Sequence, residues 1–309
     1  MKAFSIVRLA LAGAALTALA GTTVFAQSQP LLPSSPKLAF GGTISPAYDG
    51  WFDNADGSRT FMMGYYSRNW EDAVDVPIGL NNRFEPGEPD RGQPTHFRPN
   101  RNFGMFTVTV PKGFNEKLWW VLTVNGVTQR VPLSQTPDYN ITPQHASEEG
   151  PGGKYNMPAI LRFSETGPTL QMPAATQANA VSRLAMVGVP MAVDFWVDDD
   201  ARYASGSNAP INPKEPIVEM VVAKYRGAGK VRVSDGHHTL TVLEGGGFNE
   251  PYAAKGTTIV TFSEPGEYQL HVTANDLSGP GGGSSGCCWT TGLIKVSVKP
   301  AGAAPTVAR

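Results

Sequence analysis

The sequence predicts an all-β protein built from two antiparallel β-sandwich domains. Short apolar runs alternate with turn residues, which is typical of strands rather than of long helices. Gly and Pro are abundant, at 34 and 26 of 309 residues, and favour tight turns between short strands. Beyond its first segment the chain has about 280 residues, which suits two domains of ordinary size.

Residues 1–26 predict a cleaved signal peptide. Lys2 and Arg8 give a basic start, residues 9–20 form an almost continuous apolar run, and small residues surround the expected cleavage after Ala26. The run is too short for a spanning helix, and no later stretch is long enough, so we expect no membrane span after cleavage. The mature chain is therefore expected to be secreted or periplasmic.

Residues 39–133 predict the first sandwich, after a flexible Pro- and Ser-rich leader over 27–38. A hairpin is expected over 48–69 because Asp, Asn and Gly in "DNADGS" suit a tight reversal between apolar-aromatic runs. The run 103–111 alternates with period two and ends at a proline, which indicates a further strand.

A second hairpin over residues 117–131 is the strongest local signal. Asn125-Gly126 suits a two-residue type I′ turn between β-branched runs. That turn sets the pairs Val124 with Val127, Leu122 with Gln129 and Trp120 with Val131. We expect Trp120, Leu122 and Val124 to face the core because they share the more apolar side.

The long segment 74–101 is rich in proline, and loops of this length are often functional. It contains His96 together with Glu85, Glu88 and Asp90, which makes it the best candidate for a site among the five histidines. The alternative is a polar surface loop. His271, by contrast, falls within a predicted strand and is expected to be packed or solvated.

Residues 134–155 predict a linker, 156–299 a second, immunoglobulin-like sandwich, and 300–309 a disordered tail. Eight short runs bounded by Gly, Pro and Asp indicate its antiparallel strands. We take these strands as residues 159–163, 189–197, 216–225, 230–234, 238–243, 257–262, 267–274 and 293–298. The segment 177–186 is expected to form one or two helical turns.

The stretch "SEPGEYQLHVTAND" (263–276) resembles the late strands of PKD-type and cadherin-like immunoglobulin-like domains. The resemblance covers roughly the last 120 residues and implies a tyrosine corner at Tyr268, with its hydroxyl bonded to backbone upstream. The "WDFGDG" stretch of PKD domains is absent. Three longer stretches resemble an uncharacterised group of secreted bacterial proteins with a two-part layout, from which no functional residue can be carried over. They are "GYYSRNWEDAVDVPIGLNNRFEPGEPDRGQPTHF", "AKYRGAGKVRV" and "GCCWTTGLIKVSV".

Cys287 and Cys288 are the only cysteines in the chain, and they are adjacent. A disulfide between them would close a small ring, since neighbouring Cα atoms lie about 3.8 Å apart and an ordinary disulfide joins Cα atoms about 4.4–6.8 Å apart. It would enclose almost no loop and add little chain-entropy stabilisation. Three alternatives stay open: a vicinal disulfide that shapes a turn, a ligand-contacting or redox pair, and free or intermolecular thiols. With Trp289, the pair forms the candidate ligand contacts.

The tryptophans fall into two groups. Trp120 and Trp196 occupy expected core positions, whereas Trp51, Trp70 and Trp289 fall at strand ends or loops. Exposed indoles there suit stacking on sugar rings or packing against a partner, and the alternative is that each covers its own sheet edge.

Asp198, Asp199 and Asp200 are candidate metal ligands because adjacent carboxylates repel unless solvent or a cation such as calcium relieves them. The "DNADGS" turn lacks the spacing of a calcium loop, and no other cofactor is indicated. No nucleophile, zinc or phosphate-binding motif occurs, so we expect no enzyme. Without Lys2 and Arg8 the chain has 23 basic and 26 acidic residues, a net charge of −3, which excludes the basic footprint of a nucleic-acid-binding protein.

We therefore expect an exported, non-catalytic binding or structural module whose partner is an envelope protein or a carbohydrate. One alternative is an accessory subunit of an envelope redox system that uses the vicinal cysteine pair. Another is a carbohydrate-active enzyme with acid and base residues that the sequence does not locate, because such carboxylates pair in space rather than in sequence.

Overall fold

The computed structural model describes residues 38–141, 156–172, 178–201, 217–234, 240–247, 250–276 and 288–302, with Thr176 and the backbone of residues 237 and 238. Residues 37–309 form one compact unit. The described residues form strands and one short 3₁₀ helix, η1 (Pro137–Tyr139), so the all-β prediction is confirmed. Within this part of the chain, no helix is long and apolar enough to span a membrane.

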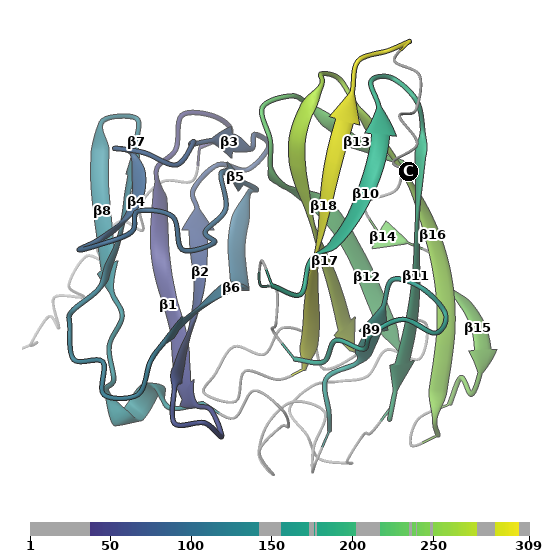
Figure 1. Cartoon of the computed structure of the whole chain (residues 1–309), viewed down its shortest axis with the longest axis horizontal. Helices are drawn as coiled ribbons and strands as arrows, with labels where there is room; N and C mark the ends of the chain where they lie inside the picture. Colours follow the sequence, from purple (N-terminus) through teal and green to yellow (C-terminus); the bar gives the residue numbers. More distant parts are fainter. Residues whose placement is uncertain are drawn as a thin grey trace, which may run out of the picture. The chain divides into compact units, whose positions relative to one another are not determined.

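Three small antiparallel sheets form from the first half of the chain (Figure 1). The first contains β1 (Ile44–Asp53), β2 (Arg59–Ser67) and β6 (Asn100–Val110). The second contains β4 (Asn82–Glu85), β7 (Trp119–Val124) and β8 (Val127–Pro132). In the third, β3 (Val74–Asp75) pairs with β5 (His96–Phe97). The hairpin expected over 48–69 is confirmed as β1–β2.

The β7–β8 hairpin has the predicted register. Val124 pairs with Val127 and Trp120 with Val131. Asn125 and Gly126 have φ values of 51° and 75°, the left-handed pair that a type I′ turn requires. The predicted core face is also confirmed, because Trp120 and its two apolar neighbours on that face are at most 4% exposed.

Aromatic rings around Trp120 form the centre of the first core. Phe84 stacks on the indole at a centroid distance of 6.2 Å, and Phe106 meets it edge-on at 5.1 Å. This cluster also includes Tyr225 and Leu293, which come from the second half of the chain. The two halves of the chain therefore share core residues. The domain boundaries expected at 133/134 and 155/156 stay a prediction.

Two five-stranded sheets form from the second half, again mostly antiparallel. One has the order β10-β18-β17-β12-β14, with bounds Val181–Met186, Trp289–Lys299, Gly266–Asp276, Val218–Arg226 and His237–His238. The other has the order β13-β16-β11-β9, with bounds Val231–Val233, Tyr252–Phe262, Met191–Asp199 and Ile160–Arg162, and β15 (Thr241–Glu244) also pairs with β16. This division of strands between two sheets is that of an immunoglobulin-like sandwich.

Two local expectations for this half are wrong. Residues 181–186 form strand β10, parallel to β18, instead of helical turns, because the edge of β18 satisfies their backbone and overrides a weak helix propensity. Trp196 is half-buried rather than in the core. In β11 the inward side chains are those of Val193, Phe195 and Val197, and strand alternation places Trp196 on the opposite face.

The tyrosine corner implied at Tyr268 is present. The buried Tyr268 hydroxyl donates to the Glu264 carbonyl at 2.9 Å, four residues upstream, and accepts from the Gly229 N–H at 3.1 Å. It therefore ties the start of β17 to the turn after β12.

Replacing Tyr268 with Phe should lower the unfolding free energy by about 1–3 kcal/mol, because the Gly229 N–H loses its acceptor in a buried setting. Urea unfolding followed by circular dichroism measures the change. Tyr66→Phe is the matched control, since the Tyr66 hydroxyl makes no hydrogen bond among the described residues. Equal stability of wild type and Tyr268→Phe would contradict the role of the corner.

Candidate functional site

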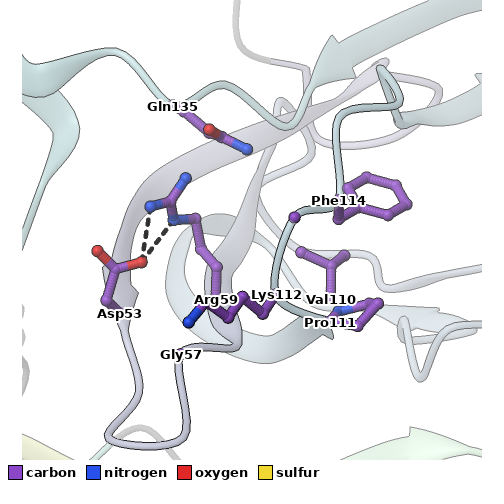
Figure 2. A pocket seen from close by; sticks show the side chains of 9 residues that line it. Asp53, Gly57, Arg59, Val110, Pro111, Lys112, Phe114 and Gln135 are labelled. Carbon is purple, nitrogen blue, oxygen red and sulfur yellow. Dashed lines mark hydrogen bonds and ion pairs between the residues drawn. The ribbon is translucent and has the colours of Figure 1, made fainter.

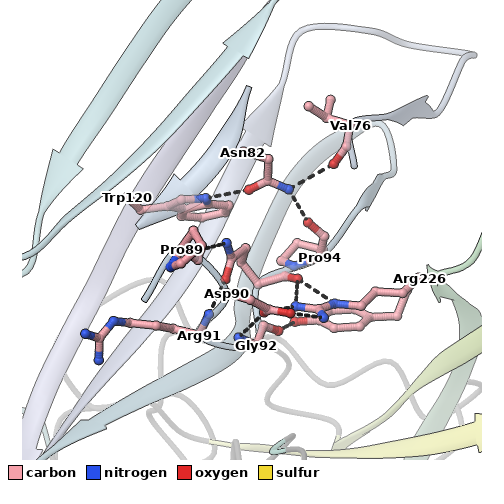
Figure 3. A network of polar contacts seen from close by, with 11 residues as sticks. Val76, Asn82, Pro89, Asp90, Arg91, Gly92, Pro94, Trp120 and Arg226 are labelled. Atoms are coloured by element: carbon pink, nitrogen blue, oxygen red, sulfur yellow. Dashed lines mark hydrogen bonds and ion pairs between the residues drawn. The ribbon is translucent and has the colours of Figure 1, made fainter. Parts of the chain in front are cut away.

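The long segment 74–101 is joined to β12, and we call this contact the joint (Figure 3). Arg226 binds Asp90 in a bidentate ion pair, with nitrogen–oxygen distances of 2.9 and 2.7 Å. Its Nε donates to the Gln93 carbonyl at 2.8 Å. The Tyr225 hydroxyl donates to the Gly92 carbonyl at 2.6 Å. Arginine suits this position because its planar group satisfies a carboxylate and a carbonyl together.

A β-bulge in β12 makes the joint possible. The register with β17 shifts between Lys224 and Arg226, so Tyr225 is the extra residue. In a regular strand, neighbouring side chains alternate between two faces. The bulge instead lets Lys224, Tyr225 and Arg226 all contact the segment 74–101.

The segment is held in shape by its own buried amides. Gln93 is fully buried, donates to the Pro89 carbonyl at 2.8 Å and accepts from the Arg91 N–H at 2.8 Å. Asn82, also fully buried, donates to the Val76 and Pro94 carbonyls and accepts from Trp120 Nε1 at 3.0 Å (Figure 3).

A second ion pair lies at the other end of the joint. Lys224 Nζ, largely buried, is 3.1 Å from both Asp75 carboxylate oxygens, and His96 Nδ1 is 2.8 Å from Asp75 Oδ1. Burial opposes ionisation of Asp75, but His96 and Lys224 outweigh it and hold the pKa of this carboxyl below its usual value. The pKa of Asp90 is likewise lowered, first by its hydrogen bonds from Arg226.

His271 lies buried beneath the joint. Its ring stacks on Tyr225 with centroids 5.5 Å apart, and its Nε2 is 3.1 Å from the Met105 carbonyl. A carbonyl only accepts, so Nε2 carries the proton and Nδ1 accepts from the Thr273 hydroxyl at 3.2 Å. Burial, followed by the charge of Arg98, lowers the pKa of His271 to about 3, so the ring is neutral at pH 7.

The candidate set His96, Glu85, Glu88 and Asp90 therefore does not form one cluster. His96 contacts Asp75, Asp90 contacts Arg226, and Glu85 contacts Arg83 at 2.9 Å. Asp75 and Lys224 are not among the residues predicted for this site. A lysine within the apolar run of β12 was the available signal, because a buried lysine needs a carboxylate partner.

Trp289 differs from the exposed indole that its place in the sequence suggested. It begins β18, is 2% exposed and packs with Met62 and Ile141. A Cβ atom on Gly104 would lie 2.6 Å from its ring, so only glycine allows this approach. Of the other two tryptophans at strand ends, Trp51 is half-buried and Trp70 is 55% exposed.

Cys288 is fully buried, and its Sγ lies 3.6 Å from the Asn156 carbonyl oxygen. Cys287 lies outside the described residues, so the ligand-contact role expected for the pair stays a prediction. The burial of Cys288 and Trp289 places two of the three candidate ligand contacts in the interior of the fold.

Asp198 and Asp199, two of the three adjacent carboxylates, lie on opposite faces of β11. Asp198 pairs with Arg162 at 2.5 Å, while Asp199 points to the opposite, buried face of β11. Burial, and then the charge of Asp276, raise the pKa of Asp199 to about 8. No group of three or more His, Cys, Asp or Glu side chains within the described ranges could hold a metal ion. We assign no metal site to Asp198, Asp199 and Asp200.

A cavity of about 480 Å³ lies at the turn end of the β1–β2 hairpin (Figure 2). Arg59 and Lys112 contribute positive charge to its wall, and Asp53 contributes a carboxylate. Its remaining lining comes from Gly57, Val110, Pro111, Gly113, Phe114 and Gln135. None of these residues takes part in the joint. The sequence predicts only a turn at this hairpin.

Comparison with known proteins adds little to this picture. No family model matches the chain, and no curated protein matches it. One solved structure that it resembles is a protein of unknown function from Porphyromonas gingivalis W83, at 6% identity and a TM-score of 0.20. The match covers 82% of this chain and 99% of that one. The resemblances to PKD-type and cadherin-like domains and to the secreted bacterial group stay predictions.

Replacing Arg226 with Lys should destabilise the protein by about 1–3 kcal/mol, because an ammonium cannot reproduce the bidentate pair together with the carbonyl contact. Chemical unfolding measures the loss. Arg232→Lys on exposed β13 is the matched control and should stay within about 0.5 kcal/mol of wild type. An equal effect of the two substitutions would contradict the joint's importance.

His271 should make stability depend on pH. Its folded pKa of about 3 lies below the unfolded value near 6.5, so its contribution is complete above pH 6.5 and is lost as pH falls toward 3. Between pH 7 and 5, wild type should lose about 2 kcal/mol relative to His271→Gln. The pKa of Asp199 is raised, so its contribution to stability changes with pH in the opposite direction. Because both proteins contain Asp199, subtracting one stability from the other removes that contribution and leaves the effect of His271. A difference that stays constant with pH would refute the assignment.

Proposed function

We propose that the protein is an exported, non-catalytic binding or structural module. The joint is the observation that carries this proposal. Three of the four ionisable side chains of segment 74–101 that suited a catalytic site, Glu85, His96 and Asp90, are held in pairs with Arg83, Asp75 and Arg226. Such pairs fix the charge and position of the acid and base groups, and this favours a structural role over proton transfer during turnover.

The proposal includes a vicinal Cys287–Cys288 disulfide that shapes the chain before β18. The complete burial of Cys288 favours this role over the redox alternative. A redox subunit needs a sulfur that a partner thiolate can reach, because thiol–disulfide exchange proceeds by direct attack. Trp289, next to Cys288, packs against apolar partners, which favours a Cys287–Cys288 disulfide that helps to position the start of β18.

For binding, two surface features support the proposal. Trp70 and Phe40 are 55% and 63% exposed, and backbone hydrogen bonds bring their segments together, from Trp70 N–H to the Leu38 carbonyl at 3.0 Å. Exposed aromatic side chains in one region suit a partner or a sugar ring. The cavity beside Arg59 is the second feature, and its size falls in the range of about 300–1,000 Å³ of ligand pockets.

The test begins with the chain produced with its own residues 1–26 in a bacterial host. We expect it in the exported fraction, lacking those residues, with an intact mass below the fully reduced value by two hydrogen atoms. The recovered protein is then incubated with a panel of neutral and acidic oligosaccharides and with cross-linked envelope proteins. Retention of a ligand without a change in its mass is the expected result.

Two outcomes would contradict the proposal. One is retention of the chain inside the cell with its leader intact. The other is chemical conversion of any bound compound, provided that the purified protein carries out the conversion without a contaminating enzyme. A Trp70→Ala variant, whose side chain is exposed, separates binding at the aromatic surface from binding at the cavity.

A further inference from the structure

The cavity at the β1–β2 hairpin has the chemistry of a site for a small acidic sugar. We propose that it binds a saccharide carrying a carboxylate. This inference rests on the proposed function and names the ligand class for one surface of the module.

Arg59 is held in place before any ligand arrives. Its Nε and Nη2 both lie 2.7 Å from Asp53 Oδ1 (Figure 2). Its guanidinium covers the Trp51 ring at 4.3 Å. The Trp51 indole is itself fixed by donating to the Thr136 carbonyl at 2.9 Å. Arg59 Nη1 has no acceptor among the described residues. A preorganised donor loses little side-chain entropy on binding, which favours affinity.

The charge of the wall favours a ligand with one negative group. Arg59 and Lys112 are cationic and Asp53 is anionic, so the lining carries a net charge of one positive unit. Lys112 is exposed and forms no ion pair in the described part of the chain. A carboxylate between Arg59 and Lys112 would receive charge-assisted hydrogen bonds, which are about twice as strong as neutral ones.

The rest of the lining favours a sugar over a simple anion. The Asp53 side chain is 55% exposed, and its Oδ2 has no partner among the described residues, so it can accept from a hydroxyl. The exposed Gln135 amide can both donate and accept. The exposed Pro111 offers apolar surface to the C–H face of a ring. A sugar acid presents a carboxylate, hydroxyl groups and an apolar C–H face in one small molecule.

The test is titration calorimetry with sodium glucuronate at low salt, with glucose and acetate as comparison ligands. Glucuronate should bind one to one, and both comparison ligands should bind at least about tenfold more weakly, since each lacks one set of contacts. Trp51 lies under Arg59, so its fluorescence should change on saturation, and Trp51→Phe should abolish that change.

Lys112→Met should weaken glucuronate binding about tenfold, the effect of losing one charge-assisted contact. Lys255→Met, an exposed substitution on β16, is the matched control and should leave the affinity unchanged. Both side chains are exposed, so neither change should unfold the protein. The same affinity in Lys112→Met as in wild type, or no saturable binding of glucuronate, would overturn the inference.

Acetate that binds as tightly as glucuronate would overturn the sugar assignment, because it would make the cavity a site for simple anions. Glucuronate could fail to bind while an oligosaccharide or an envelope protein from the panel is retained without chemical change. In that case this inference fails and the proposed function stands. Failure of export or evidence of turnover would count against the proposed function itself, whatever the result with glucuronate.

Discussion

The bulge at Tyr225 is the constraint on which the contact between β12 and the segment 74–101 depends. It turns three consecutive side chains of β12 toward the segment 74–101, where a regular strand would offer alternate ones. Lys224 and Arg226 then meet Asp75 and Asp90, and Tyr225 enters the first apolar core. These groups are only partly exposed to solvent, so their pairing is screened less than that of surface ions.

Burial and pairing reinforce each other in this region. The Tyr225 ring covers His271, which stays neutral because a charged imidazole would lose its hydration without gaining a carboxylate. Asn82 donates to the Val76 and Pro94 carbonyls. Gln93 adds a second donor to the Pro89 carbonyl, which also accepts from a backbone N–H. The segment is therefore a rigid part of the fold, although its composition is that of a loop.

The features predicted correctly from sequence are those that neighbouring residues determine. Asn125-Gly126 sets the β7–β8 register because few residue pairs adopt two left-handed conformations in succession. The Pro-Gly turn before Tyr268 places its hydroxyl within reach of Glu264 in the same local unit. The error at Trp196 has a different origin, since alternation shows that two faces exist but not which face is covered. The error at β10 arose because pairing with β18, more than 100 residues further along the chain, overrides local propensity.

The sequence by itself determined the all-β class and the two hairpins, because turn geometry and strand alternation act over a few residues. The tyrosine corner followed from the resemblance to immunoglobulin-like domains. Only the tertiary structure decided that His96 and Asp90 belong to separate ion pairs, and that Trp289 is buried against Gly104. Lys224 and Asp75 are 149 residues apart in the chain. Contacts over such separations follow from how sheets pack and where one strand bulges, and these depend on the whole fold at once.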